Sequence, residues 1–457
     1  MASSIEKQDL GTGSVKKHLV QLAVPAVVGQ VVNLLYNVVD RIFVGQVVGK
    51  DALTGVGLFT PILMLITAFA LLAGAGGAPR AAIALGRGDK EGAEKILGNC
   101  FTVLMIFSVI LTVVFYWASP ALLRLFGASE KTLPYAVEYS RIYTLGSVFI
   151  LIVMGMNSFI TTQGFAKISM LTTVIGAVIN IILDAVLILG VGWGVKGAAV
   201  ATVVSQAVSA LWILKFLRGQ KTVLRLRGAN MRLVGKVIGP CLGLGISTFV
   251  MVSTESVLSV SFTSSLSRYG GDIAVGAMTV LTSINQLITM PLQGICQGGQ
   301  PLISYNFGAG KLDRVKKAFR YMFTACVVYT TLFWAALMLL PQAFAGIFTP
   351  DDELKAYTAW ALRIFLAGGF SVGFQLSCQQ AFMALGQAKV SLLMACLRKL
   401  ILLIPLIFIL PVFFSNDVMA VFLAEPVSDI LAAAITTATF FFQFKKILNR
   451  RKLGQGT

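Results

Sequence analysis

The chain has 457 residues, of which 57% are hydrophobic and 12% are charged, and its 37 basic and 19 acidic residues give a formal net charge of +18. Soluble globular domains carry roughly 25% charged residues, so this composition excludes an ordinary soluble enzyme. A nucleic-acid partner would require the basic residues to form one patch or groove, but they alternate between loops, so no nucleic-acid partner is expected.

Long stretches without Asp, Glu, Lys or Arg recur along the chain, at residues 18–39, 52–79, 96–123, 142–166, 273–310 and 321–350. A helix of about 20 apolar residues crosses a bilayer, and these runs lack the alternation of barrel strands, so we predict an all-α polytopic membrane protein. The twelve predicted helices cover residues 18–48, 52–84, 96–119, 134–162, 168–190, 197–217, 237–266, 272–305, 317–340, 356–384, 390–413 and 418–444.

Basic residues are concentrated in alternate connections between these helices. The central connection and its flanks hold seven of them and no acid, namely Lys215, Arg218, Lys221, Arg225, Arg227, Arg232 and Lys236. Because basic loops stay on the cytoplasmic side, this linker and both termini are expected in the cytoplasm. The first tail has no cleavable signal and leads directly into a full-length hydrophobic segment.

The chain repeats itself at a constant offset of 222 residues. The shift places Gly76, Gly77 and Pro79 on Gly298, Gly299 and Pro301, and Gly164, Ala166 and Lys167 on Gly386, Ala388 and Lys389. Six helices per repeat give both halves the same orientation, about an axis along the membrane normal. We therefore predict an N-terminal half (1–218), a basic linker (219–236) and a C-terminal half (237–457), which is the architecture of an alternating-access carrier.

The first predicted helix has one polar face. Gln30, Asn33, Asn37 and Asp40 follow at spacings of three, four and three residues, which aligns them along one side of a helix. A buried ionised carboxylate is expensive in hydrocarbon, so Asp40 requires a partner, a water-filled cavity or a proton. The alternative without a function is that Asp40 pairs with Arg41.

Segments 168–190 and 197–217 add a second polar group. Asn180 and Asp184 are one turn apart, and Thr202 lies on the next helix. Counted from the helix ends, these residues and Asp40 reach the same depth, so we expect them to meet. Two carboxylates in a low-dielectric pocket resist ionising together, so one is expected to hold a proton and lose it to a cationic substrate or metal ion. Alternatively, Asp184 caps a helix break.

The C-terminal half carries its acids elsewhere. Glu255 follows Pro240 by fifteen residues, as Asp40 follows Pro25, which makes Glu255 a candidate counterpart of Asp40. At the 222-residue offset, however, the pair Asn180 and Asp184 falls on two leucines, at positions 402 and 406. Ion coupling is therefore expected in the N-terminal half.

Two further polar sets in the C-terminal half have simple structural explanations. Arg398 and Lys399 are predicted partners of Glu425 and Asp429. Segment 272–305 has a neutral polar stripe, for which cavity lining and hydrogen bonding between helices are equally good explanations; the stripe consists of Thr282, Gln286, Thr289, Gln293 and Gln297.

Several strings together resemble the multidrug and toxic compound extrusion (MATE) family. They are VVDRIFVGQVVGKDALTGVGL at 38–58, TTQGFAKISM at 161–170, NIILDAVLILGVGWGVKGAAVATVVSQ at 180–206, QPLISYNFGAGK at 300–311 and ALGQAKVS at 384–391. The resemblance covers essentially the whole chain and implies twelve helices in two six-helix lobes. It also implies export of cationic amphipathic drugs or metabolites in exchange for protons or sodium ions, with no cofactor.

The resemblance also assigns roles to individual residues. Asp40, Asn180, Asp184 and Thr202 match the ion-coupling positions of the DinF-like branch, and Pro25 matches a position where the first helix bends. The same four residues offer oxygen ligands should the ion be Na+. The acids of the NorM-like branch are not matched, because segment 356–384 is neutral and Glu255 lies about two turns further along its helix. Candidate cavity residues are Asn33, Tyr36, Asn37, Asn157, Gln206, Glu255, Gln286, Met290, Gln293 and Gln379.

Other functions fit the sequence less well. A lipid-linked sugar flippase of the same superfamily is expected to carry basic residues in its cleft. A membrane-embedded hydrolase needs clustered His, Asp or Ser groups, and the chain has a single histidine, His18. A channel would show pore rings from an oligomer, whereas a repeat within one chain suits a monomeric secondary transporter. We expect that transporter in the inner membrane of a prokaryote.

Overall fold

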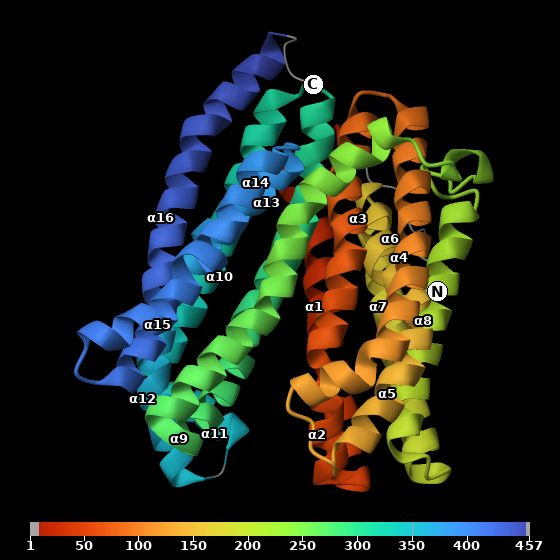
Figure 1. Cartoon of the computed structure of the whole chain (residues 1–457). Helices are drawn as coiled ribbons and strands as arrows, with labels where there is room; N and C mark the ends of the chain where they lie inside the picture. Colours follow the sequence, from red (N-terminus) through yellow and green to blue (C-terminus); the bar gives the residue numbers. More distant parts are fainter. Residues whose placement is uncertain (1–8, 350, 454–457) are drawn as a thin grey trace.

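The computed structural model describes residues 9–349 and 351–453 of the chain and, within them, the backbone but not the side chains of residues 37, 41, 42, 46 and 50. Figure 1 shows a bundle of long helices in this described part. Its N-terminal half contains α1 (Val15–Phe43), η1 (Val44–Val48), α2 (Lys50–Leu58), α3 (Thr60–Gly86), α4 (Lys90–Leu125), α5 (Leu133–Leu145), α6 (Ser147–Thr162), α7 (Ala166–Asp184), η2 (Ala185–Gly190) and α8 (Gly194–Arg218).

The rest of the chain begins with η3 (Gly228–Met231) and α9 (Gly235–Gly308). It continues with α10 (Leu312–Leu339), α11 (Pro341–Phe348), α12 (Asp352–Phe365), η4 (Gly369–Ser371), α13 (Val372–Ala384), α14 (Ala388–Cys396), η5 (Leu397–Leu403), α15 (Ile404–Phe413) and α16 (Asp417–Lys452). The segments η1, η2 and η5 are π-helices.

The described helices provide the twelve predicted crossings. Nine are long and apolar enough to span a membrane, and two bent pairs, α5 with α6 (57°) and α12 with α13 (51°), raise the number in this part of the chain to eleven. The twelfth comes from α9, whose 74 residues would measure about 110 Å if straight. Its helical backbone is broken at Gly271 (φ 65°, ψ −161°), and Figure 1 shows the green ribbon descending and then returning.

The backbone repeats at the same offset as the sequence. Glycines with positive φ occur at residues 49, 88 and 164, and again 222 residues later at 271, 310 and 386. The bends agree as well, since Gly146 (φ −84°, ψ 0°) and Gly368 (φ −85°, ψ 0°) precede α6 and η4. Gly271 therefore corresponds to Gly49, where an L-residue with a side chain would be strained. The α9 break is thus the second copy of the turn before α2.

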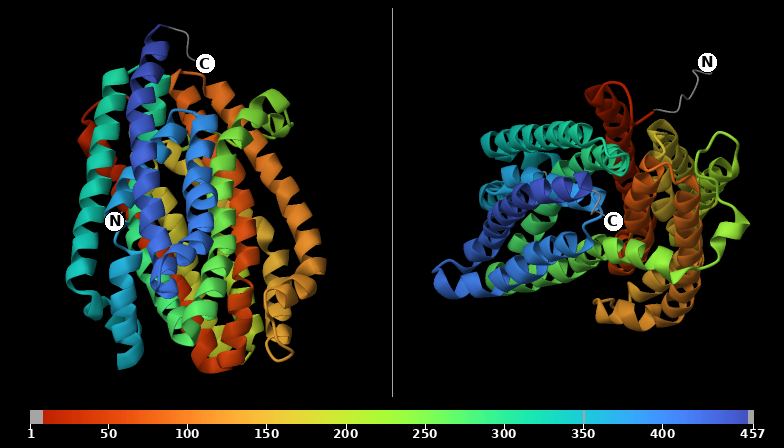
Figure 2. Two further views of the ribbon diagram at one scale, coloured as in Figure 1. Left: turned by 60° about the vertical axis from the view of Figure 1, so that its left-hand side comes forward. Right: turned by 90° about the horizontal axis from the view of Figure 1, so that it is seen from above.

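Each half lends its first helical turns to the other. The core of the C-terminal half includes Leu19 and Leu22 of α1, whereas the core of the N-terminal half includes Ile238 and Cys241 of α9. Leu19 and Cys241 are related by the 222-residue offset. The exchange is therefore reciprocal, as expected for repeats about an axis along the membrane normal. Viewed along that direction, the halves lie side by side (Figure 2).

Glycines permit close contact between the halves. A Cβ atom at Gly298 would come within 2.4 Å of Ala23 Cα, and one at Gly86 within 2.0 Å of the Tyr305 carbonyl oxygen. Both contacts lie toward the end of the molecule that carries the connection 219–234, here called the linker end. Toward the opposite end, the ribbons of the two halves diverge (Figure 1).

The basic connection is folded onto the N-terminal half. The side-chain oxygen of Asn99 accepts a hydrogen bond from Val234 N (2.7 Å), and the Gln163 side chain accepts one from Val223 N (2.7 Å). Arg227 also forms an ion pair with the buried Glu94 (3.3 Å). The linker is therefore anchored to α4 and α6 and is not a free tether.

Candidate functional site

Two carboxylic acids meet inside the N-terminal half. Asp40 lies in the last turn of α1, and Asp184 is the last residue of α7, where the helix changes to the π-helix η2. The two residues are only 9% and 0% exposed, and their carboxyl groups interact with each other through a side-chain hydrogen bond and by charge. This is the meeting that the sequence predicted. Asp184 makes no side-chain cap hydrogen bond at η2, so the capping alternative is wrong.

The pair is surrounded by oxygen atoms that lack ordinary donors. Neither carboxylate oxygen of Asp184 accepts a bond of regular geometry from a described N–H or O–H group, and the side-chain oxygen of Asn180 is also buried without one. The Asn180 amide donates instead to the Thr202 hydroxyl (3.4 Å), which itself donates to the Ala198 carbonyl (3.0 Å). A buried group of acceptors is stabilised by a proton or a cation, since an unsatisfied acceptor in a low dielectric is costly.

Three tyrosines complete this group, and the sequence analysis identified only Tyr36. Tyr139 and Tyr143, one turn apart on α5, are both buried and interact electrostatically with Asp40. The Tyr139 side chain also hydrogen-bonds with Thr202. Their four-residue spacing on a membrane helix was the available signal, but aromatic pairs at that spacing are common in cores.

A cavity of about 290 Å³ lies between the halves, toward the linker end from the acid pair. Of the predicted residues, Pro25, Asn33, Tyr36, Asn157, Gln206 and Gln293 line it. Tyr36 also interacts with Asp40 and Asp184, so it connects the cavity with the acid pair. α1 continues through Pro25 as a helix.

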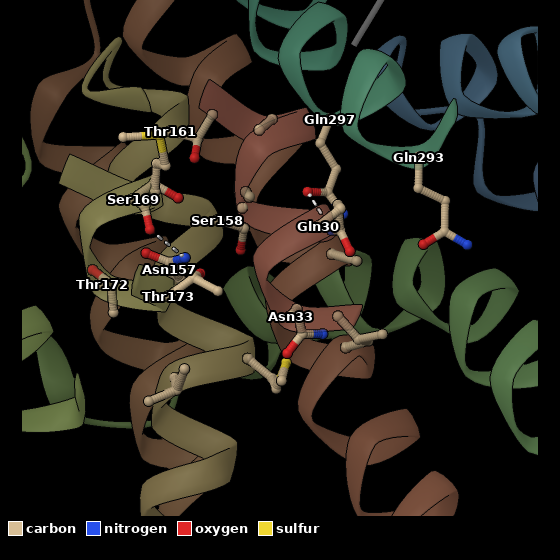
Figure 3. A pocket seen from close by; sticks show the side chains of 18 of the residues that line it. Gln30, Asn33, Asn157, Ser158, Thr161, Ser169, Thr172, Thr173, Gln293 and Gln297 are labelled. Carbon is tan, nitrogen blue, oxygen red and sulfur yellow. Dashed lines mark hydrogen bonds between the residues drawn. The ribbon is translucent and has the colours of Figure 1, made fainter. Parts of the chain in front are cut away.

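Amide side chains face this cavity from both halves (Figure 3). Gln30 of α1 donates to Gln297 of α9 (3.1 Å), which joins the two halves, and Asn157 donates to the Ser169 carbonyl (3.3 Å). Four methionines, at positions 154, 170, 251 and 383, also contribute. Among the described lining residues there is no acid or base other than the Tyr36 phenol. Such a lining suits a molecule with both polar and apolar surface.

Four predicted cavity residues are not part of this lining. Gln286, Met290 and Glu255 lie further toward the opposite end, and Gln286 is exposed. Gln379 is buried and contacts the sulfur of Met251 (3.0 Å). The side chains of Asn37 and of Arg41, the alternative partner of Asp40, lie outside the described residues.

The C-terminal half contains a network of five charges. Arg398 on η5 donates to Asp429 (2.7 Å) and Glu425 (3.1 Å) on α16, as the sequence suggested. Lys399 does not share those partners directly: its ammonium donates to Glu255 and to the Met251 carbonyl (2.9 Å). The expectation that Lys399 pairs with Glu425 and Asp429 is therefore corrected, because its side chain leaves η5 toward α9.

The proposed equivalence of Glu255 and Asp40 is also wrong. The matching turns at Gly49 and Gly271 set the register of the two halves, and in that register Asp40 corresponds to Phe262. Glu255 corresponds instead to Asn33, a residue that lines the cavity. Counting from Pro240 misled because that proline has no equivalent at the 222-residue offset.

Comparison with known proteins agrees with this architecture. The MatE family model matches residues 25–186 and again 247–409, two segments that begin 222 residues apart. The chain is 23% identical over 424 residues to a protein named multidrug export protein MepA from Staphylococcus saprophyticus, covering 92% of this chain and 93% of the relative. A similar protein of the same name from Staphylococcus aureus is also 23% identical, over 425 residues, with the same coverage.

Solved structures show the same arrangement. One, described as the outward-facing conformation of a multidrug resistance MATE family transporter of the MOP superfamily, matches with a TM-score of 0.91 and 25% identity, over 97% of this chain and 99% of that chain. Another, a MOP superfamily transporter from Pyrococcus furiosus described by the reverse polarity of its binding pocket, matches with a TM-score of 0.90 and 25% identity, over 98% and 99%. The predicted fold of two six-helix repeats is confirmed.

Proposed function

The chain belongs to the MatE family, and on that premise we propose that it is an ion-coupled antiporter that exports cationic amphipathic molecules by alternating access between its two halves. The observation that carries this proposal is the buried pair of Asp40 and Asp184 beside the cavity. A transporter needs a group whose charge changes when the driving ion binds, and a carboxylate pair supplies one.

The pair suits a proton as the coupling ion. When a proton is held between Asp40 and Asp184, one negative charge is cancelled and the buried acceptors are partly satisfied. Loss of that proton restores two like charges, which favours a conformation in which water or a cation reaches them. Tyr36 lies between the pair and the cavity lining, so a change of charge at the pair is felt at the cavity wall.

Sodium is the alternative coupling ion. Asp40, Asp184, Asn180 and Thr202 present carboxylate, amide and hydroxyl oxygens, which hard cations prefer as ligands. A proton requires only the two carboxylates, whereas sodium would also use the neutral oxygens. Variants of those neutral residues therefore separate the two ions.

The charges around the cavity favour cationic over anionic cargo. The cavity lining is neutral, and the acid pair lies beside it. A lipid-linked sugar flippase would need free basic groups for a pyrophosphate, but Arg398 and Lys399 are each bound to carboxylates. With every group ionised, the five charges of that network sum to −1.

We further infer the orientation and the location of the transporter. The seven basic residues of the linker region place the linker end in the cytoplasm by the positive-inside rule. Both ends of the described chain belong to that side in this orientation, and the divergence of the halves then faces outward. A single chain with two halves works as a monomer in the cell membrane of a prokaryote.

Transport in proteoliposomes with separately imposed proton and sodium gradients tests this function. An inward proton crossing ~100 mV releases about 2.3 kcal/mol, and a tenfold concentration ratio requires about 1.4 kcal/mol. Export of a lipophilic cation such as tetraphenylphosphonium should therefore follow the proton gradient alone. Export that needs sodium and ignores the proton gradient would replace the proton by sodium. Absence of export under both gradients would contradict cation antiport.

A further inference from the structure

The five-charge network of the C-terminal half reaches from a buried core to an exposed carboxylate. Glu425 and Asp429 are buried on α16 and held by Arg398, whose main-chain carbonyl accepts a bond from Ser428 (2.9 Å). Lys399 is 5% exposed, whereas its partner Glu255 is 50% exposed. The network therefore presents a single accessible anion, and a buried ammonium occupies it.

The repeat indicates which way this anion faces. Glu255 corresponds to Asn33, and Arg398 and Lys399 correspond to Gly176 and Ala177 at the 222-residue offset. All three residues of the N-terminal half line the cavity. Because the halves are related about a common axis, positions equivalent to cavity residues also face the space between the halves. The charge network thus occupies the level of the cavity and not that of the acid pair.

Local contacts agree with that placement. Met251 lines the cavity, and its carbonyl oxygen accepts a hydrogen bond from Lys399. Glu255 follows Met251 by four residues, so it lies one turn further along the same face of α9. The Lys399 ammonium therefore lies between a cavity-lining carbonyl and a carboxylate at the cavity edge, which is an arrangement that suits an organic ammonium or phosphonium group.

We propose that Glu255 and the Met251 carbonyl form a cation subsite at the edge of the cavity, that Lys399 occupies it as a tethered cation in the absence of cargo, and that the cationic group of an exported molecule displaces Lys399. The inference rests on the proposed function and deepens it. A displaced Lys399 remains compensated, because its charge already interacts with Glu425 and Asp429. No new buried charge is left unpaired by the exchange.

The charge balance makes a specific demand on the cargo. The network sums to −1 when every group is ionised, so one monovalent cation brings it to zero. A second positive charge on the cargo would leave an uncompensated charge in a low-dielectric space. Removing the lysine charge changes the sum to −2. Lys399 is thus a specificity-determining residue, and its loss should improve binding of cations in general and of dications most.

Isothermal titration of the full-length protein in detergent tests this competition, with tetraphenylphosphonium as the monocation and dequalinium as the dication. Lys399→Met should bind tetraphenylphosphonium about tenfold more tightly than wild type, within the usual range of coupling between sites, and should gain more for dequalinium. Glu255→Gln should bind both more weakly. The double variant should resemble Glu255→Gln, because the lysine competes only where the carboxylate is present. Lys399→Arg, which retains the charge, should stay near wild type.

The exposed ion pair of Glu138 and Lys196 (3.1 Å) provides the matched control, and Glu138→Gln and Lys196→Met should change neither affinity. If Lys399→Met does not fold, Lys399→Gln takes its place in the same cycle, since it keeps a donor for the Met251 carbonyl. Equal or weaker binding by the Lys399 variants, or a gain that persists without Glu255, would overturn the inference. A wild-type protein that neither binds nor exports tetraphenylphosphonium would instead contradict the proposed function.

Discussion

Asp40 of α1 and Asp184 of α7 bring their carboxyl groups together in a buried place where Asp184 finds no ordinary hydrogen-bond donor among the described residues. Nearly the whole first half of the N-terminal lobe separates them in sequence. The contact is costly for folding, because like charges repel and buried acceptors lose water. Its cost falls when a proton or cation binds, which is the property required of a coupling site.

The first prediction concerns this pair. Asp184→Asn cannot alternate between a charged and a neutral form, so proton-driven export of tetraphenylphosphonium should fall about tenfold or more, equivalent to about 1.4 kcal/mol. Asp40→Asn should behave in the same way. Asp51→Asn, which alters an exposed acid in the first turn of α2, is the matched control. Normal coupling by either pair variant, at matched amounts in the vesicles, would remove the pair from the mechanism.

The second prediction separates proton from sodium. Thr202→Val keeps the shape of the side chain but removes the hydroxyl that accepts from Asn180 and donates to the Ala198 carbonyl. We expect a loss of about 1 kcal/mol of unfolding free energy and proton-driven export that continues. Thermal unfolding in detergent and export in vesicles measure the two effects. Complete loss of export in a folded Thr202→Val protein would indicate that the neutral oxygens bind the ion.

The third prediction concerns orientation. In a cysteine-free background, Gly219→Cys at the end of α8 should resist an impermeant maleimide in intact cells and react after the cells are opened. Glu130→Cys, in the exposed connection before α5 at the opposite end, should react in intact cells. The reverse labelling pattern would invert the inferred topology.

The fourth prediction concerns the contact between the halves. A Cβ atom at Gly298 would lie 2.4 Å from Ala23 Cα, whereas one at Gly239 on the same helix meets nothing within 4 Å. Gly298→Ala should therefore destabilise the protein by about 1–3 kcal/mol, as overpacking typically does. Gly239→Ala should be neutral or slightly stabilising, because alanine favours helix. Equal unfolding temperatures for the two variants would show that this contact tolerates a methyl group.

Much of this protein follows from local patterns in its chain. Charge-free runs, basic loops and the 222-residue repeat predict twelve membrane helices in two halves, because hydrophobic length and loop charge act on each segment separately. The acids Asp40 and Asp184 were also identifiable, since a carboxylate within an apolar helix stands out wherever its helix lies. Their depth along the helices was enough to predict that they meet.

Packing between helices decided the rest. Lys399 was expected beside Glu425 and Asp429 but bonds Glu255, because the direction of a long side chain depends on which helix lies opposite. Glu255 was matched to Asp40 by counting from a proline, whereas the turn at Gly271 shows that it corresponds to Asn33. Helical periodicity defines the face on which a residue lies. The partner that the face meets depends on contacts between segments distant in sequence, and no local pattern encodes those contacts.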